Sequence, residues 1–267
     1  MFRVLFFDSG LGGTSVFSAV KELNPNCSYY YLFDNECFPY GNKDEAFIIK
    51  RTDEILEESV RRFSVSLIIV ACNTASTVAL PKLRDRIKIP IVGVVPAIKP
   101  AAIKSKSKII GLVATPGTIR RSYTNDLIEK FAKDCKVLKI GTTDLVRLCE
   151  RKMAGKPVTL TEVAEVFGPW LMLKPEERPD SIVLGCTHFP LVKDEIGTLF
   201  PDAVLVDSGE AIGRRVRSLI SLNQAPSYEE ISDGNHAFYT GNLENLSGYE
   251  NAFKSLGFKD LTAFSLK

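Results

Sequence analysis

The sequence predicts an α/β protein made of two similar lobes, each a mostly parallel sheet flanked by helices. Short, fully apolar runs alternate with longer amphipathic stretches along nearly the whole chain, which is typical of parallel strands buried on both faces. A weak internal repeat supports two lobes, since the strand and glycine turn of VLFFDSGLGG resemble the later segment IIGLVATPGT. The stretch 96–108, PAIKPAAIKSKSK, combines prolines with lysines and is expected to cross between the lobes. We therefore expect residues 1–96 plus 210–267 to form the first lobe and residues 97–209 the second.

The elements follow from these runs in chain order. Apolar runs predict strands at 4–7, 29–33, 67–71, 91–94, 109–113, 136–140, 182–184 and 203–206. Amphipathic stretches between them predict helices at 14–23, 44–63, 75–87, 118–132, 144–153, 161–173, 191–199 and 210–222. The chain after about residue 210 is expected to return and pack on the first lobe.

Charge and composition exclude several classes of function. The chain has 267 residues, with 34 basic and 32 acidic side chains and a formal charge of +2, so neither nucleic acid nor a membrane is an expected partner. The start MFRVLFFDSG shows no signal-peptide cleavage site, and no apolar segment approaches the roughly 18 residues that span a bilayer. We therefore expect a cytoplasmic protein whose six cysteines stay reduced. These cysteines form no CxxC pair, so no metal site is expected.

Two cysteines are notable because each follows an apolar strand run. Cys72 lies in IIVACNTAS and Cys186 in IVLGCTHFP. In parallel α/β folds ligands bind beyond the carboxyl ends of the strands, where helix N-termini and backbone N–H groups stabilise a thiolate. Each cysteine is a candidate nucleophile or base, and the alternative is a small buried core side chain. Polar residues follow both cysteines and favour a site over a packed core. They are Asn73, Thr74, Thr187 and His188.

A histidine and a carboxylate could assist these thiols. His188 lies two residues beyond Cys186 and could polarise the thiol or protonate a bound carboxylate; the alternative is a loop histidine held by hydrogen bonds. Asp8 ends the first strand and could bind a cation or act as an acid or base; the alternative is a turn or capping residue. His236, in the strand-like HAFYTG, is expected to be structural.

The segment GLGGTS imitates a dinucleotide-binding turn. Asp34 at the end of YYYLFD would be the acid that takes the ribose. Ser15 stands where a third glycine or alanine belongs, and Asp8 would face a pyrophosphate of like charge. The chain has no Walker-type phosphate loop, so no nucleotide cofactor is expected. CNTASTV also lacks the arginine that a cysteine-dependent phosphatase uses to hold phosphate.

Two equivalent thiols suit one kind of reaction particularly well. A proton taken from one face of a stereocentre and returned to the other needs one thiolate and one thiol, whose roles exchange with the direction of reaction. A cysteine hydrolase would need only one thiol.

Five motifs together resemble glutamate racemases of the aspartate/glutamate racemase superfamily. They are FFDSGLGG at 6–13, FPYG at 38–41, ACNTAS at 71–76, ATPGT at 114–118 and GCTHFPL at 185–191, in the order of that family. The resemblance implies two α/β lobes with the active site in the cleft between them. It also implies that L- and D-glutamate are interconverted without a cofactor, which supplies D-glutamate for peptidoglycan synthesis. A homodimer is a candidate assembly, since dimers occur in the family.

The resemblance also assigns roles to residues of this chain. Cys72 would act on D-glutamate and Cys186 on L-glutamate, with Asp8, His188 and Glu150 assisting the proton transfers. The substrate-contacting positions would be Asp8, Ser9, Tyr40, Gly41, Asn73, Thr74, Thr187 and His188, with Thr115 and Thr118 adding contacts to a carboxylate. The chain begins only seven residues before Asp8, so activation by a cell-wall precursor through an N-terminal extension is not expected.

Other interpretations stay open at this point. An aspartate or hydantoin racemase would share the thiol pair, and pocket length separates these enzymes. A non-catalytic nucleotide or amino-acid binding module would rest on the GLGG turn and Asp34. The four remaining cysteines are assigned to packing, although one of them, next to FPYG, could line the cleft. They are Cys27, Cys37, Cys135 and Cys149.

Overall fold

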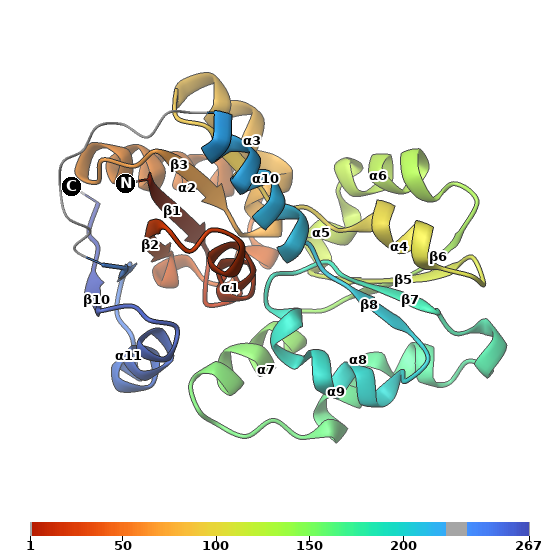
Figure 1. Ribbon diagram of the computed structural model, residues 1–267. Coiled ribbons are helices and arrows are strands. Elements are labelled where there is room, and N and C mark those ends of the chain that lie inside the picture. The colour runs from red at the N-terminus through yellow and green to blue at the C-terminus, as the bar shows by residue number, and fades with distance from the viewer. Residues whose placement is uncertain (1, 223–233, 267) are drawn as a thin grey trace.

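The computed structural model describes residues 2–222 and 234–266. It contains two α/β lobes that lie side by side, the first at the left and the second at the right of Figure 1. Each lobe is a parallel sheet covered by helices on both faces, so the predicted fold class is confirmed. All eight predicted strands are present, each within a few residues of its expected bounds.

The first lobe is built on a six-stranded parallel sheet in the order β10-β9-β2-β1-β3-β4. Its strands are β1 Phe2–Asp8, β2 Cys27–Phe33, β3 Leu67–Val70, β4 Ile91–Gly93, β9 His236–Tyr239 and β10 Asp260–Ala263. Its helices are α1 Thr14–Leu23, α2 Glu45–Arg62, α3 Asn73–Arg86, α10 Gly209–Leu222 and α11 Leu246–Ser255. Successive side chains of a strand point to opposite faces. Val4 and Phe6 therefore pack with α1, α10 and α11, whereas Leu5 and Phe7 pack with α2 and α3.

The second lobe is built on a four-stranded parallel sheet in the order β6-β5-β7-β8. Its strands are β5 Ile109–Ala114, β6 Lys136–Gly141, β7 Ser181–Leu184 and β8 Val204–Val206. Its helices are α4 Ile98–Lys104, α5 Pro116–Arg120, α6 Ser122–Ala132, α7 Asp144–Met153, α8 Leu160–Leu171 and α9 Lys193–Leu199. One core lies under α7, α8 and α9, and the other under α4 and α6. Short 3-10 helices complete the chain at η1 Asn35–Cys37, η2 Tyr40–Asn42, η3 Pro175–Glu177 and η4 Phe189–Val192.

The internal repeat is visible in the topology. The order β2-β1-β3-β4 in the first lobe has the same pattern as β6-β5-β7-β8 in the second. In each lobe the central strand is flanked by the strand that follows it and by the next one, which creates a crevice at the carboxyl ends where the strand order reverses. Asp8 ends β1 and Thr115 follows the equivalent strand β5, whereas Cys72 and Cys186 follow the equivalent strands β3 and β7.

The chain from 96 to 108 runs from β4 of the first sheet to β5 of the second, and it forms a helix that the sequence analysis did not predict. It contains α4, whose buried Ile98, Ala101 and Ala102 pack on the second sheet. Pro100 is tolerated because it lies in the first turn, where a backbone N–H has no partner within the helix. The apolar face of α4 therefore outweighs the signal from prolines and lysines.

The predicted helix 118–132 is wrong in detail, because it is interrupted at Arg121. This residue is extended (φ −69°, ψ 143°) and separates α5 from α6. Its buried guanidinium pairs with Glu45 at 3.2 Å and donates to Thr77 Oγ1 at 3.4 Å, both in the first lobe. Such contacts are set by tertiary structure, so helical periodicity could not show the break. Similarly, the predicted helix 191–199 is divided between η4 and α9.

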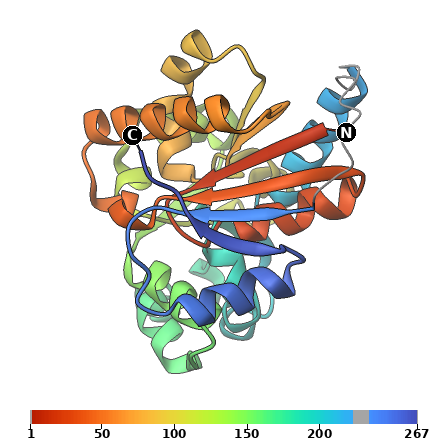
Figure 2. The ribbon, with the colours of Figure 1, turned by 90° about the vertical axis from the view of Figure 1, so that its left-hand side faces the viewer.

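The last part of the described chain lies on the first lobe. β9 pairs with β2, α10 packs against α1, and α11, at the lower left of Figure 1, lies near α7. Figure 2 shows this C-terminal part in blue beside and beneath the red strands. We propose the lobe boundaries 1–96 plus 210–267 and 97–209, because the strands of the two sheets divide there. Over residues 2–222 and 234–266, no helix has the length and apolar character needed to cross a membrane.

Candidate active site

Asp8 is the last residue of β1, and its side chain is fully buried. The carboxylate accepts hydrogen bonds from the backbone N–H groups of Ser9 (2.6 Å) and Gly13 and from the Thr187 hydroxyl (3.1 Å). Burial raises the pKa of Asp8, while the charge of His188 and these hydrogen bonds lower it in part. Because Thr187 follows β7, Asp8 connects the strand ends of the two lobes.

Cys72 lies two residues beyond the end of β3 and is the N-cap residue of α3. Its Sγ lies 3.6 Å from Ser9 Oγ, and that hydroxyl is 3.4 Å from Asp8 Oδ1. Burial and the charge of Asp8 raise the pKa of the Cys72 thiol, and the Ala75 N–H and the Ser9 hydroxyl offset this only partly. Cys72 is therefore a neutral thiol near pH 7, with a carboxylate close by.

Cys186 has a different environment. Its Sγ lies 3.7 Å from His188 Nδ1, and His188 Nε2 lies 2.6 Å from Glu150 Oε1. His188 is buried, and Glu150, on α7, is mostly buried. These three side chains form a thiol, imidazole and carboxylate series, an arrangement in which the imidazole can take the proton of the thiol.

The protonation of His188 follows from its two neighbours. Burial alone would lower the pKa of His188, but the hydrogen bonds to Cys186 and Glu150 outweigh burial and raise it well above its usual value. We assign the Nε2 proton to the short contact with Glu150. The Gly12 N–H, 3.2 Å from the same nitrogen, then makes a close approach without a hydrogen bond. Nδ1 is left to exchange a proton with Cys186.

The two thiols lie around the same carboxylate. Asp8 is joined to Cys72 through the Ser9 hydroxyl, and it accepts a hydrogen bond from Thr187, the residue after Cys186. The sequence analysis placed both at equivalent strand ends, and the structure brings them to one site. One thiol has a carboxylate for its neighbour and the other has an imidazole.

The glycine turn after β1 makes room for this site. A Cβ at Gly10 would lie 2.4 Å from Glu150 Oε1, and a Cβ at Gly12 would lie 2.3 Å from His188 Nδ1. The turn therefore packs against the side chains of the second lobe. The space that a pyrophosphate would need in a dinucleotide fold is occupied by these side chains.

Asp34 is equally unavailable to a ribose. It is fully buried and accepts hydrogen bonds from Tyr40 (2.7 Å), from Arg51 (2.7 and 3.0 Å) and from Thr240. The nucleotide-binding alternative fails on this observation. It also means that the Tyr40 hydroxyl is directed to Asp34 rather than into the site.

A series of hydroxyl groups extends the site across the lobes. Thr74 Oγ1, in the first turn of α3, lies 3.2 Å from Thr115 Oγ1, and Thr115 Oγ1 lies 3.0 Å from Thr118 Oγ1. Gly41 packs on Thr115, since a Cβ there would lie 2.9 Å from Thr115 Cβ. Asn73, which begins α3, is buried nearby. Apart from Tyr40, the site candidates thus place polar side chains or close backbone contacts around the strand ends.

The cavity beside Cys186 is small. It has a volume of about 10 Å³, roughly the room that one water molecule needs. Its lining comes from both lobes and includes Asn73, Cys186, Thr187, Asp207, Ser208 and Gly209. A substrate of amino-acid size would enter only if the lobes moved apart, as lids and lobes do in many enzymes.

Sequence reasoning missed several of these residues. Asp207 and Ser208 directly follow β8, so the pattern that identified the cysteines, polar residues after a strand, could have found them. The Leu11 N–H donates to Glu150 Oε1 at 2.6 Å, and the Tyr249 hydroxyl lies 3.4 Å from Glu150 Oε2. These two contacts depend on tertiary structure and had no sequence signal.

The other cysteines and His236 lie in structural positions. Cys149 is buried in a core of the second lobe, and Cys27, Cys37 and Cys135 pack against cores at partly buried positions. His236 lies 2.9 Å from Asp260 and stacks on Tyr30.

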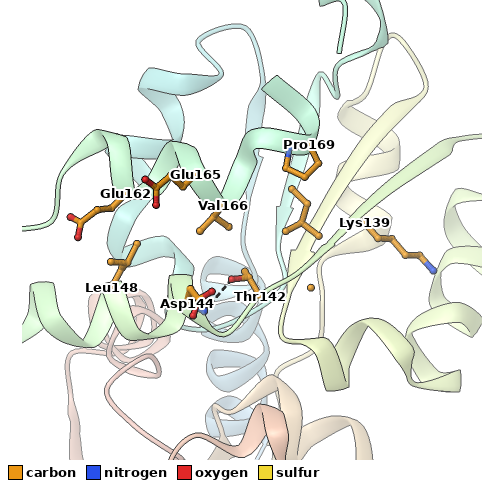
Figure 3. A pocket seen from close by; sticks show the side chains of 10 residues that line it. Lys139, Thr142, Asp144, Leu148, Glu162, Glu165, Val166 and Pro169 are labelled. Carbon is orange, nitrogen blue, oxygen red and sulfur yellow. Dashed lines mark hydrogen bonds between the residues drawn. The ribbon is translucent and has the colours of Figure 1, made fainter. Parts of the chain in front are cut away.

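An open pocket of about 590 Å³ lies away from the cysteines, between β6, α7 and α8 (Figure 3). Its polar lining includes Lys139, Asp144, Glu162 and Glu165. The Asp144 N–H donates to Thr142 Oγ1 at 3.1 Å, the dashed line in Figure 3. Neither a thiol nor an imidazole faces this pocket, so we place the chemistry at the strand ends instead.

The close approach at Gly12 gives a test of the site geometry. Gly12→Ala is expected to destabilise the protein by about 1–3 kcal/mol, because the new methyl overlaps His188 and the turn must shift. Gly168→Ala is the matched control: a Cβ there meets nothing within 4 Å in α8, so we expect a gain of about 0.5–1 kcal/mol. Urea denaturation gives both values, and the NMR shift of the His188 ring should change only in the first variant. An unperturbed His188 signal in Gly12→Ala would contradict this geometry.

Comparisons with known proteins agree with the geometry. A family model described as Asp/Glu/Hydantoin racemase matches residues 14–215. The glutamate racemase of Klebsiella pneumoniae (strain 342) is 48% identical over 236 residues, which are 88% of this chain and 82% of that protein. The glutamate racemase of Pasteurella multocida (strain Pm70) is 46% identical over 265 residues, 99% of this chain and 97% of that protein.

A solved structure is similar over the full length. The Escherichia coli glutamate racemase, crystallised in complex with L-glutamate and the activator UDP-MurNAc-ala, aligns with 100% of this chain and 99% of its own. The sequence identity is 43% and the TM-score is 0.94.

Proposed function

Because the chain belongs to the Asp/Glu/Hydantoin racemase family, we propose that it interconverts L- and D-glutamate, with Cys72 and Cys186 as the two proton-transferring groups. The observation that carries the proposal is the pair of thiols at equivalent strand ends, one beside Asp8 and the other beside His188. An acid and a base on opposite sides of one carbon are what inversion by proton transfer requires.

The forward reaction starts with the Cys186 proton already on His188 Nδ1, in keeping with the raised pKa of the imidazole. The Cys186 thiolate then takes the α-proton of L-glutamate, and the electron pair left on the α-carbon is delocalised into the carboxylate. The Cys72 thiol gives its proton to the opposite face, which yields D-glutamate and a Cys72 thiolate. The reverse reaction starts from that thiolate, with Asp8 and Ser9 as its neighbours. The enzyme regains its first protonation state through proton exchange with solvent.

The difficulty of this reaction is the weak acidity of the α-hydrogen. Placed hydrogen-bond donors in a dry site lower the barrier by stabilising charge as it develops on the carboxylate. Asn73 and Thr74, at the N-terminus of α3, are suited to this role. Thr187, Thr115 and Thr118 supply further hydroxyl groups from the second lobe. Asp8 is placed to pair with the substrate ammonium group. Ser9, Tyr40 and Gly41 complete the proposed contacts, Tyr40 through its backbone.

The relatives support glutamate over other substrates of the family. Those at 46% and 48% identity are named glutamate racemases, and the similar Escherichia coli structure contains L-glutamate. We propose that the product supplies D-glutamate for peptidoglycan synthesis. A cytoplasmic location suits both that role and a site that needs reduced thiols.

A deuterium experiment tests this function. The purified protein, with no added cofactor, is incubated with L-glutamate in deuterated water, and optical rotation and α-deuterium are followed together. We expect rotation to fall to zero while deuterium enters the α-position, since the product proton comes from an exchangeable thiol. L-aspartate serves as the comparison substrate and should react far more slowly. Unchanged rotation with no deuterium in glutamate would overturn the proposal, and preferred turnover of aspartate would favour the sister enzyme.

A further inference from the structure

We propose that Tyr249, on the C-terminal helix α11, is a positioning residue for the proton transfers at Cys186. Its hydroxyl holds the Glu150 carboxylate toward His188, and through that contact it aligns the imidazole with the thiol. This inference rests on the proposed function, because it concerns the same reaction. It assigns a role to a part of the first lobe that carries none of the racemase motifs.

The contacts of Glu150 show what the hydroxyl contributes. Oε1 takes the Leu11 N–H and His188 Nε2, each at 2.6 Å. Oε2 faces Tyr249, whose hydroxyl lies at 3.4 Å. That distance is long for an O–H···O hydrogen bond, so the contribution should be modest. It nonetheless fixes the second oxygen, and with it the plane of the carboxylate.

Two contacts, one helical turn apart, fix the register of α11 against α7. Asn245, the N-cap of α11, reaches the carbonyl oxygen of Ala154 at the end of α7 through its Nδ2 at 3.5 Å. Tyr249 lies four residues after Asn245 in α11, and Glu150 lies four residues before Ala154 in α7. Four residues are about one helical turn, so the two pairs are the contacts expected one turn apart between antiparallel helices. Met153 of α7 also packs against the core of the first lobe. The position of Glu150 is therefore set by both lobes.

The phenol itself is well placed to be a donor. Its ring stacks on Phe33, with ring centres 5.9 Å apart and planes at 9°. Burial and the charge of Glu150 raise the pKa of the Tyr249 hydroxyl, so it keeps its proton throughout the working pH range. Tyr249 thus has a fixed ring and a proton to donate.

Without the Tyr249 hydroxyl, water could hydrogen-bond to the Glu150 carboxylate in its place. Both residues line a pocket of about 360 Å³ between the lobes, together with Asn35, Arg151, Lys156 and Asn245. Arg151 is engaged with Glu162 at 2.6 Å, so it does not replace the phenol. Loss of the hydroxyl would leave Oε2 to solvent and allow the carboxylate to rotate away from His188.

Tyr249→Phe tests the proposal, because it keeps the stacked ring and removes only the donor. We expect kcat for racemisation to fall about 3- to 10-fold with little change in KM, the range that loss of one weak hydrogen bond corresponds to. Tyr239→Phe is the matched control. Tyr239 lies against the same Phe33 ring, and its hydroxyl makes no hydrogen bond within residues 2–222 and 234–266. The racemisation rate of Tyr239→Phe should therefore equal that of the wild type.

Two further readouts separate positioning from a general structural effect. Cys186 is proposed to take the proton of L-glutamate. In Tyr249→Phe, the primary isotope effect measured with L-[2-²H]glutamate should therefore be larger than in the wild type. The effect measured with D-[2-²H]glutamate should rise less. In addition, Tyr249→Phe should have no further effect on kcat in a Glu150→Gln background, since residues in one network are not additive.

The outcomes distinguish this inference from the proposed function. If the wild-type protein fails to racemise glutamate, the function is wrong. If the wild type is active and Tyr249→Phe matches it in kcat and in both isotope effects, only the role of Tyr249 is overturned. The role of Tyr249 would also be overturned if Tyr249→Phe lowered kcat by the same factor in the wild-type and Glu150→Gln backgrounds. Tyr249 would then act by a route that does not involve Glu150.

Discussion

Replacing either strand-end cysteine is expected to lower the racemisation rate by roughly 10³-fold, within the 10²–10⁴-fold range of general acid–base catalysis. Cys72→Ala removes the group beside Asp8 and Ser9, and Cys186→Ala removes the group beside His188. Either change leaves one face of the substrate α-carbon without an acid or base. The loss should appear equally in kcat/KM for both enantiomers, because the ratio of the two kcat/KM values must equal the equilibrium constant, which is one for a pair of enantiomers.

Cys135→Ala is the control for the loss of a thiol. Cys135 packs at a partly buried position against a core of the second lobe and has no contact with the site. Its replacement should leave the rate unchanged. Near-normal turnover by Cys72→Ala or Cys186→Ala would show that the two-thiol mechanism is wrong even if the activity is right.

His188→Gln should produce the second large effect, a fall in kcat of about 10²-fold. Glutamine retains a hydrogen-bonding group toward Glu150 but cannot take the Cys186 proton. The same variant tests the protonation state through stability. The pKa of His188 is raised in the folded protein, mainly by the hydrogen bonds to Cys186 and Glu150, which outweigh the opposing effect of burial.

The sign of that effect on stability follows from proton binding. A group whose folded pKa is raised contributes stability in full below its unfolded pKa, about 6.5 for histidine, and this contribution is lost as the pH rises through the folded pKa. The free energy of unfolding of the wild type, relative to His188→Gln, should therefore decline as the pH rises above about 6.5. Urea denaturation at several pH values measures the difference. A difference that is constant with pH would show that His188 does not hold the extra proton.

The sequence predicted the framework of the site well because its signals are local. The run before Asp8 and the runs before the two cysteines are apolar on both faces, which only buried parallel strands explain. Polar residues directly after such strands identify a ligand-binding edge. The inference that two thiols suit proton transfer on opposite faces of one carbon also required no structure.

The features that the sequence did not show depend on contacts between distant segments. α4 forms in a stretch rich in prolines and lysines because its apolar face is buried, and Arg121 interrupts a periodic helix to reach Glu45. The Tyr40 hydroxyl is held by Asp34, a contact that the motif position of Tyr40 does not show. Tyr249 meets Glu150 only through the register of two helices from different lobes. Local patterns carry no information about such pairs.

The two-thiol account is tested most directly by exchange without inversion in the single-cysteine variants. In deuterated water, Cys72→Ala should place deuterium on the α-carbon of L-glutamate but not of D-glutamate, and Cys186→Ala should do the reverse. Neither variant should change optical rotation, because each retains one thiol that removes and returns a proton on one face. Exchange of both enantiomers by either variant would contradict the assignment of one thiol to each face.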